Sequence, residues 1–261
     1  MPPVVTDAIV LHAFDYLESS RILKLVTRDA GVRSVLARGA RRSKRRFGAA
    51  LDLFAQGTAE LQVKTGRDLD TLGGFDVTRA RPQLAESLSR FAGANTIAEL
   101  ALRFGGDDTN ADLFDTVAAT LDAIAASIGD AARDATLAGA WRVLADLGVA
   151  PTIDQCAECH APIDPDAAAL FSHPAGGAVC ARCGHLARSG RTLPPAARAA
   201  LRGWLGDRAA PLTTLDANAA HAHQRLLREF VREHLADDRP LRAFENWEQE
   251  TLMPRTAGGA A

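Results

Sequence analysis

The stretch RILKLVTRDAGVRSVLAR, residues 21–38, reads as two strands joined by a tight turn. Both halves are short and rich in β-branched residues, and Asp29-Ala30-Gly31 separates them. Similar runs follow on either side, so that the predicted strands cover residues 8–13, 21–28, 32–38, 58–65 and 69–78. About five strands with hairpin-length turns fit a small closed barrel better than an open sheet. Residues 1–80 are therefore expected to form a β-barrel domain.

Beyond residue 80 the apolar residues recur with a helical period. The stripes that predict helices are Leu84-Leu88-Phe91, Phe114-Val117-Leu121-Ile124-Ile128, Leu137-Trp141-Leu144 and Leu226-Leu227-Phe230-Val231-Leu235. Gly148 is expected to end the third helix, and Pro194-Pro195 to open another that runs through Leu205. We expect helical regions at 81–150 and 191–248, a cysteine-bearing module at 151–190 and a flexible tail at 249–261.

The bulk composition indicates a folded chain that does not enter a membrane. Its 261 residues are 47% hydrophobic and 24% charged, which supports a substantial core in one large domain or two to three small ones. No run approaches the roughly 18 consecutive apolar residues of a membrane span. The first 20 residues lack the charged n-region of a signal peptide. We therefore expect a cytoplasmic location.

All four cysteines fall within a 28-residue window, as Cys156-x2-Cys159 and Cys180-x2-Cys183. Two such pairs match a tetrahedral zinc site with four thiolate ligands. Two disulfides are disfavoured in a cytosolic chain, and a redox pair would not occur twice. His160, His173 and His185 are the possible substitute ligands. Four thiolates leave no open position for catalysis, so one structural Zn²⁺ is expected.

The charge of the module argues against a role in gripping phosphate. Residues 151–190 carry Asp154, Glu158, Asp164 and Asp166 against Arg182 and Arg188. A segment too small for a core of its own gains its stability from the metal. We therefore expect the zinc to act as a structural staple.

Positive charge gathers elsewhere, in the stretch RGARRSKRR, residues 38–46, which holds six basic residues and no acidic one. The whole chain has a net charge of −2, yet residues 1–81 hold 14 Lys and Arg against 9 Asp and Glu. This contrast predicts an anionic partner at the barrel. A solvated loop and a nuclear localisation signal are the alternatives. Phe47 follows the run and either stacks on a base or, as we expect, anchors the next strand in the core.

The ordered motifs Tyr16-x-Glu18-x-Ser20, Thr27-x3-Gly31, 37–41 (ARGAR) and Leu51-x2-Phe54 resemble the N-terminal domain of the RecO family of bacterial DNA-repair proteins. Later motifs resemble the rest of that family, namely Leu147-Gly148, the two cysteine pairs and Arg239-Pro240-Leu241-Arg242. The resemblance covers nearly the whole chain. It implies an α+β multidomain fold: an N-terminal five-stranded OB-fold barrel, then an α-helical domain with an inserted four-cysteine zinc module.

The resemblance also implies a function, that of a recombination mediator. Members of the family bind single- and double-stranded DNA, anneal complementary strands, and work with RecR to load RecA onto strands coated by single-strand-binding protein. The family's helical domain offers an apolar, basic-rimmed pocket for the acidic tail of that protein. Relatives often place basic and aromatic residues where this chain has 137–141 (LAGAW), with Arg133 and Arg142 nearby.

In physical terms, the basic loop and the neighbouring strands would neutralise phosphates without reading base sequence. The residues expected to bind DNA are Lys24, Arg33, Arg38, Arg41, Arg42, Lys44, Arg45 and Arg46.

Two other classes of function stay open at this point. An enzyme such as a nuclease or zinc hydrolase is disfavoured, because the chain has no HExxH, P-loop, GxSxG or deaminase HxE motif. Asp68 and Asp70 could form a carboxylate pair for two metals, but such a pair at the start of a strand is commonplace. The second class is a zinc-stabilised interaction scaffold whose basic barrel loop docks an acidic protein tail.

Overall fold

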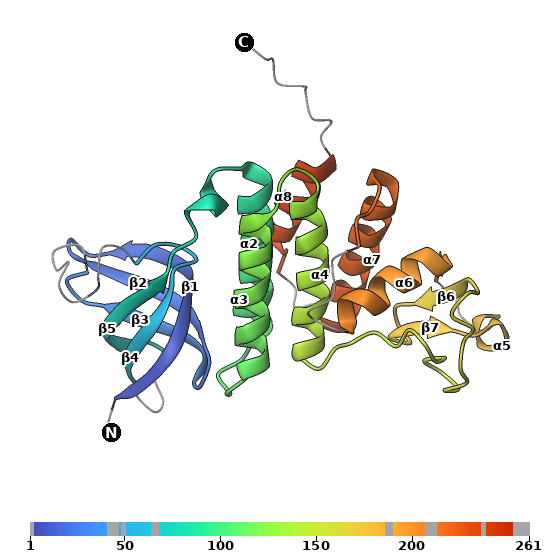
Figure 1. The fold of residues 1–261 in the computed structure, drawn as a ribbon. Helices are drawn as coiled ribbons and strands as arrows, with labels where there is room; N and C mark the ends of the chain where they lie inside the picture. The colour runs from blue at the N-terminus through green and yellow to red at the C-terminus, as the bar shows by residue number, and fades with distance from the viewer. Residues whose placement is uncertain are drawn as a thin grey trace, which may run out of the picture.

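The computed structural model describes residues 3–40, 47, 51–63, 68–185, 190–206, 213–235 and 239–252. Figure 1 shows three parts in a row: a β-barrel at one end, a layer of helices in the middle, and a small sheet with the cysteine module at the other end. The barrel and the module therefore face away from each other across the helices.

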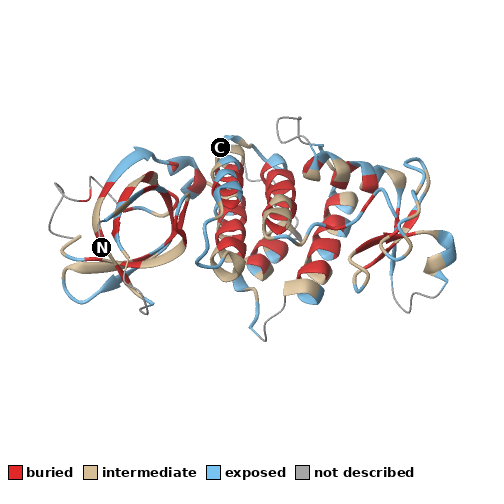
Figure 2. Cartoon of the chain, turned by 90° about the horizontal axis from the view of Figure 1, so that it is seen from below, coloured by how far each residue is buried: buried red, intermediate tan, exposed pale blue. Residues whose placement is uncertain are grey.

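Five strands close the barrel: β1 (Val4–Tyr16), β2 (Ser20–Thr27), β3 (Gly31–Ala37), β4 (Gln56–Gln62) and β5 (Asp70–Arg79). Their order around the ring is β1-β2-β3-β5-β4, with β3 and β5 parallel and all other pairs antiparallel. Every expected strand is confirmed, with β1 longer at both ends than predicted. Figure 2 shows the barrel as a ring, in which buried residues are interspersed with exposed ones. A closed five-stranded barrel with this strand order is the OB-fold that was expected.

The hairpin of residues 21–38 depends on Thr27 and Gly31. The Thr27 hydroxyl donates to the Gly31 carbonyl at 2.8 Å and accepts from the Ala30 amide at 3.0 Å. Gly31 has φ +66°, and a Cβ there would lie 2.5 Å from the Asp108 carbonyl oxygen. Glycine therefore allows both the turn and the close approach of the helical layer.

A short 3-10 helix, η1 (Pro82–Ala85), leads into the helical layer. Its longer helices are α2 (Leu88–Phe104), α3 (Ala111–Ala126), α4 (Ala131–Asp146), α6 (Pro195–Leu205), α7 (Ala217–Leu235) and α8 (Arg242–Leu252). α2 packs against α3, α4 and α8, and α4 also contacts α6 and α7. The predicted helices are thus confirmed, and α8 is an element that the apolar pattern did not reveal.

Two predicted apolar stripes were partly wrong. Leu84 lies in η1, and α2 begins only at Leu88 because Ser87 takes an extended conformation with φ −142°. Leu88 is 70% exposed, whereas α2 buries the face that carries Ile97. Ile128 lies beyond the end of α3 and is 81% exposed. In both cases an element boundary interrupts a spacing that looks continuous in the sequence.

The end of α4 agrees with the prediction for Gly148. This glycine has φ +81° and its amide donates to Ala145, while the next amide, of Val149, donates to Leu144. These two bonds form a Schellman motif that satisfies the last carbonyls of the helix. On the same helix Trp141 is fully buried, with its ring 5.2 Å from that of Phe230 in α7.

The barrel is fixed to the helical layer by apolar and ionic contacts. Ile9, Val26 and Phe54 on the outside of the barrel belong to the same buried cluster as the helices. Arg28, directly after β2, pairs with Asp115 of α3. These contacts define which side of the barrel is covered.

The module between α4 and α6 contains a three-stranded sheet of order β7-β6-β8 and one short helix. Its elements are β6 (Ala169–Ser172), β7 (Gly177–Val179), α5 (Ala181–Gly184) and β8 (Arg191–Leu193). Arg198 of α6 is fully buried and donates to the carbonyls of Asp164, Ala167 and Ile153 at 2.6, 2.8 and 3.1 Å. One guanidinium therefore joins three points of the module to α6.

The chain end differs from the expectation of a tail from residue 249. α8 continues through Leu252 and buries Phe244 and Trp247, whose rings are 5.5 Å apart. Within the described part of the chain, no helix is both long and apolar enough to cross a membrane.

Candidate metal centre and nucleic-acid interface

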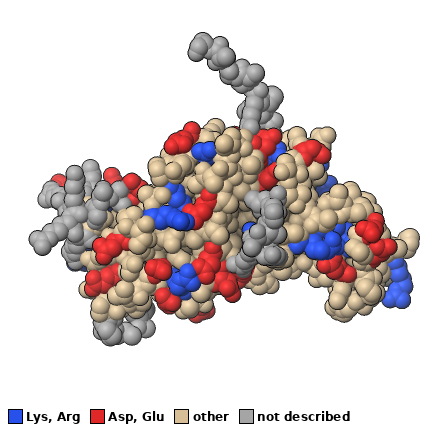
Figure 3. All heavy atoms as spheres, in the orientation of Figure 1, with Lys and Arg blue, Asp and Glu red and all other residues tan. Residues whose placement is uncertain are grey.

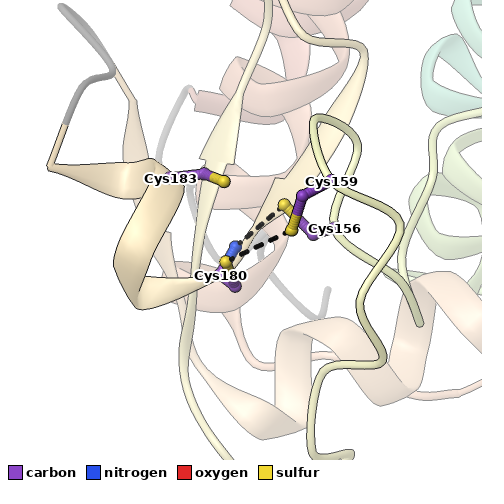
Figure 4. Close-up of side chains that lie close together, drawn as sticks. All are labelled: Cys156, Cys159, Cys180 and Cys183. Carbon is purple, nitrogen blue, oxygen red and sulfur yellow. Dashed lines mark hydrogen bonds between the residues drawn. The ribbon is translucent and has the colours of Figure 1, made fainter.

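The four cysteines come from two tight turns that face each other, as Figure 4 shows. In the first turn the Cys156 amide donates to Ala161, and the His160 amide donates back to the Cys156 carbonyl at 2.8 Å. In the second, Cys180 precedes α5 with an extended backbone, and Cys183 lies within that helix. Both turns place thiols three residues apart on one side of the backbone.

The distances between the sulfurs fit a tetrahedral metal site. All four Sγ atoms lie within 4.8 Å of one another. The Sγ atoms of Cys159 and Cys180 are 3.8 Å apart. Ligands about 2.3 Å from a central zinc, at the corners of a tetrahedron, lie about 3.8 Å from each other. The cluster can therefore hold a metal ion, and its donor set is the one typical of structural zinc.

The pKa values of the thiols also support a metal site. Burial raises the pKa of the Cys156 thiol, but backbone N–H groups, that of Cys180 first, donate to its sulfur and bring the pKa down to about 6. The hydrogen bond to the Cys159 sulfur raises the pKa of Cys183 to about 12. Some thiolate character is thus stabilised by the backbone, whereas four thiolates together require a cation.

None of the three histidines proposed as substitute ligands belongs to this group of sulfurs. His160 and His185 are exposed at the surface of the module. The His173 ring lies beside Glu229 of α7, with Nε2 3.0 Å from the carboxylate. Among the described residues, the four cysteines are the one group that could hold a metal ion.

The basic run is only partly within the described residues. Arg41, Arg42, Lys44, Arg45 and Arg46 lie outside them, and Arg38 is exposed directly after β3. Lys24 is exposed on the outer face of β2, opposite Ser34 of β3. Neither Lys24 nor Arg38 takes part in an ion pair with any described residue.

Arg33, the other described residue that was predicted to bind DNA, helps to hold the barrel against the helical layer. Its Nε donates to the Ala30 carbonyl at 2.6 Å, and its Nη2 donates to the Asp107 carbonyl at 3.0 Å. It therefore lies where the barrel meets the loop before α3. Its charge is not neutralised, because both acceptors are carbonyls, but its guanidinium is largely engaged.

Two further arginines of the barrel, close in sequence to the basic run, are paired with acids. Arg28 pairs with Asp115, and Arg21 Nε lies 3.3 Å from Asp15. Phe47 is 2% exposed and belongs to the core of the barrel, as expected for an anchor, so it does not stack on a ligand. On the face drawn in Figure 3, acidic and basic side chains of the described residues are interspersed, and these residues form no continuous basic patch there.

The sequence interpretation missed the aromatic residues on the outside of β1. Phe14 and Tyr16 are each 41% exposed, and His12 is exposed beside them. Their spacing of two residues is a strand signal, but a bulge between Val10 and His12 reverses which positions face outward. The alternation that Ala8 and Val10 begin would otherwise have directed these three side chains into the barrel.

Comparison with known proteins assigns the whole chain to one family. Residues 1–81 match the family model "Recombination protein O N terminal", and residues 85–243 match "Recombination protein O C terminal". The DNA repair protein RecO of Anaeromyxobacter dehalogenans (strain 2CP-C) is 38% identical over 250 residues, which cover 94% of this chain and 96% of that protein. The DNA repair protein RecO of Gloeobacter violaceus is 33% identical over 228 residues, 87% of this chain and 85% of its own length.

A closed five-stranded barrel, a helical layer with a four-cysteine module, and matches over both halves of the chain lead to one conclusion: this chain belongs to the RecO family of DNA repair proteins.

Proposed function

We propose that this chain is a recombination mediator that binds single- and double-stranded DNA without sequence preference, anneals complementary strands, and helps RecR to load RecA. It acts without covalent chemistry, in the cytoplasm, on nucleoid DNA. One observation carries the proposal: a closed OB-type barrel bears the net positive charge of an otherwise acidic chain, 14 Lys and Arg against 9 Asp and Glu over residues 1–81. Barrels of this kind bind oligonucleotides on their strand faces and loops.

Electrostatic attraction to phosphate explains how such a surface promotes annealing. Cations that neutralise phosphates on two strands reduce the repulsion between them and leave the base edges free to pair. We propose that Arg38, Arg41, Arg42, Lys44, Arg45 and Arg46 provide this charge, with Lys24 and Arg33 in support. Arg33 contributes its charge near the helical layer, since its N–H groups already bind carbonyls.

For the cysteine module we propose one structural Zn²⁺ on Cys156, Cys159, Cys180 and Cys183. The four sulfurs fit such an ion in number and spacing. The module uses its own charged groups internally: Arg202 of α6 donates to Asp154 at 2.8 Å, and Arg198 donates to carbonyls of the module. We therefore assign the metal to the fold and the barrel to DNA.

The acidic tail of single-strand-binding protein is the second partner that we propose, in addition to RecR. Residues 137–141 are buried in the centre of the helical layer and offer no surface for it. A cavity of about 350 Å³ between α2, α7 and α8 has suitable chemistry, with Phe104 and Phe244 among its apolar walls and Arg232 on its rim. We propose this cavity as the docking place. Binding of an acidic, apolar-ended peptide that Arg232→Ala does not weaken would refute it.

The proposal is tested by fluorescence anisotropy of a labelled single-stranded oligonucleotide over a series of salt concentrations. Two variants remove the same charge, Arg45→Ala with Arg46→Ala in the barrel loop, and Arg239→Ala with Arg242→Ala at exposed positions near α8. We expect the loop variant to bind more weakly and to reduce the slope of log K against log salt by about 1.4, that is about 0.7 for each lost contact. The α8 variant should retain the slope of the wild type.

Strand annealing is measured with the same proteins, as the rate at which two complementary labelled strands pair. We expect the loop variant to anneal slowly and the α8 variant to anneal at the rate of the wild type. Wild-type protein that binds neither single strands nor duplex at low salt would refute the proposal. Salt-dependent binding to an acidic peptide, without binding to DNA, would instead favour the interaction scaffold.

A further inference from the structure

The outer face of β1, β2 and β3 carries a row of exposed aromatic and half-buried aliphatic side chains next to basic ones. The cross-strand register joins His12 to Lys24, and Phe14 to Ile22, which in turn pairs with Leu36. Because side chains alternate along a strand, all of these project from the same face. The intervening Ala13, Leu23 and Val35 point into the barrel instead.

The aromatic residues are on the outside because of the bulge in β1. Leu11, between Val10 and His12, has no partner in the ladder with β2. From this point on, the side chains that would point into the barrel point outward, and the others point inward. Before the bulge, Ile9 and Leu11 pack against the helical layer. After it, Phe14 and Tyr16 are each 41% exposed. Bulges of this kind redirect side chains and are frequent beside functional sites.

The backbone spacing of β1 sets how far apart its exposed rings lie. The His12 and Phe14 ring centroids are 5.8 Å apart at an interplanar angle of 65°, which orients the Phe14 ring edge-to-face. Residues two apart on a strand are separated by about 6.8 Å. This is about twice the 3.4 Å step between stacked bases in one strand of a duplex. The two rings Phe14 and Tyr16 therefore match bases that have been unstacked from each other.

The charge on this face favours an anionic partner, and the exposed rings beside it favour a nucleic acid among such partners. Lys24 and Arg38 are exposed on it or at its edge, and the basic run follows Arg38 directly in the sequence. The carboxylate of Asp15, between the two rings in the sequence of β1, lies 3.3 Å from Arg21 Nε. Aromatic rings beside cations are the recurring device by which OB-type barrels hold single strands.

We propose that Phe14 and Tyr16 form a stacking platform for bases of single-stranded DNA, with Lys24 and Arg38 binding the adjacent phosphates. This inference rests on the proposed function and adds a preference for the strand state: a single strand offers its base faces to the rings, whereas a duplex hides them. Two rings hold only one or two bases, so most bases of a bound strand stay free to pair during annealing.

The test compares anisotropy with a single-stranded oligo-dT and with a duplex of equal length, using wild type and the variant Phe14→Leu with Tyr16→Leu. Leucine keeps the surface apolar and removes the rings. We expect at least about fivefold weaker binding to the single strand, since each stacked base contributes a factor of about five or more. Affinity for the duplex and the salt slope should be unchanged, because no cation has been removed. Tyr16→Phe keeps a ring and should bind like wild type.

Val77→Ala is the matched control, since Val77 is a 39% exposed apolar residue on β5 and should have no effect on binding. Thermal melting of each variant by circular dichroism establishes that the barrel is folded. A second readout is photocrosslinking of the protein to a strand containing 5-bromouracil, mapped by mass spectrometry. We expect the crosslink on the peptide with Tyr16, which is the single tyrosine of the chain.

The outcomes separate this inference from the function on which it rests. If the leucine variant binds the single strand as tightly as wild type while Arg45→Ala with Arg46→Ala binds weakly, the platform is refuted and DNA binding stands. Equal losses for single strand and duplex would also refute stacking. If wild type binds neither DNA, the proposed function itself fails.

Discussion

The barrel and the cysteine module lie at opposite ends of the helical layer and are stabilised in different ways (Figure 1). The barrel closes its own backbone ladder around an apolar core that includes Leu25, Phe47 and Phe75. The module has short strands, one turn of helix, and a cluster of four thiols. A self-sufficient barrel can place charged and aromatic groups on its surface for a ligand. In the module, the backbone carbonyls and Asp154 instead bind arginines of α6 and so stabilise the fold.

The same contrast holds for the arginines of the two ends. At the module, Arg198 is fully buried and Arg202 pairs with Asp154, so both serve the fold. At the barrel, Arg28 is paired, whereas Arg38 is exposed directly after β3. Identical side chains therefore have different roles according to which acceptors the fold provides.

Removal of the metal should give the largest effect and should affect only one end. Structural zinc contributes on the order of 10 kcal/mol of binding free energy at neutral pH. In Cys156→Ser, we expect one zinc fewer per chain by elemental analysis and rapid hydrogen exchange over residues 151–190, with the barrel still protected. The affinity for zinc should fall as the pH falls, because the thiolates take up protons.

His160→Ala, at an exposed neighbour of the cluster, should keep its zinc. Rapid exchange throughout the barrel would contradict the separation of the two ends.

Arg198→Met should cost about 3–5 kcal/mol in the free energy of unfolding, because three buried carbonyls lose their donor. The measurement is urea denaturation followed by circular dichroism. Arg202→Met is the control on the same helix, since this side chain is 37% exposed and its ion pair should be worth less than about 1 kcal/mol. Similar losses for both variants would show that the buried hydrogen bonds of Arg198 stabilise the fold no more than the exposed ion pair of Arg202.

Acid should destabilise the helical layer through His223. Burial lowers the pKa of His223 to about 4, and its ring packs 4.8 Å from that of Trp204. An unfolded histidine titrates near pH 6.5, so the unfolded chain binds more protons between pH 6.5 and 4. Stability should therefore fall as the pH falls through this window, by up to roughly 3 kcal/mol. In His223→Leu, the free energy of unfolding should depend less steeply on pH. If the denaturation midpoint of this variant falls with pH as steeply as that of the wild type, this account is contradicted.

The smallest effect concerns the contact between barrel and helices. Gly31→Ala should lose about 2 kcal/mol or more, because alanine is strained at φ +66° and its Cβ would meet the Asp108 carbonyl at 2.5 Å. Gly39→Ala is a matched control, with φ +69° and no atom of the described residues within 4 Å of the added Cβ, and should lose about 1 kcal/mol. Equal losses measured by thermal unfolding would mean that backbone conformation alone matters at Gly31.

Much of this architecture could be predicted from sequence because its signals are local. The hairpin of residues 21–38 and the helix end at Gly148 follow from strand composition and glycine geometry. The cysteine cluster follows from spacing, since two pairs of thiols on tight turns have few other uses. The break at Ser87 and the helix α8 were missed, because the apolar spacing does not record where a turn interrupts it.

The remaining features depend on tertiary contacts. Arg198 lies on an amphipathic helix and reads as a surface residue until the module supplies its carbonyls. Likewise, the bulge at Leu11 decides which side of the barrel carries Phe14 and Tyr16. A sequence pattern of period two cannot reveal such a change of facing.

The most direct test of the contrast between the two ends is hydrogen–deuterium exchange with and without a saturating single-stranded oligonucleotide. We predict that DNA slows exchange in peptides from residues 12–40 and leaves residues 151–190 unchanged. Slower exchange confined to the module, with the barrel unaffected, would contradict the assignment of DNA to the barrel.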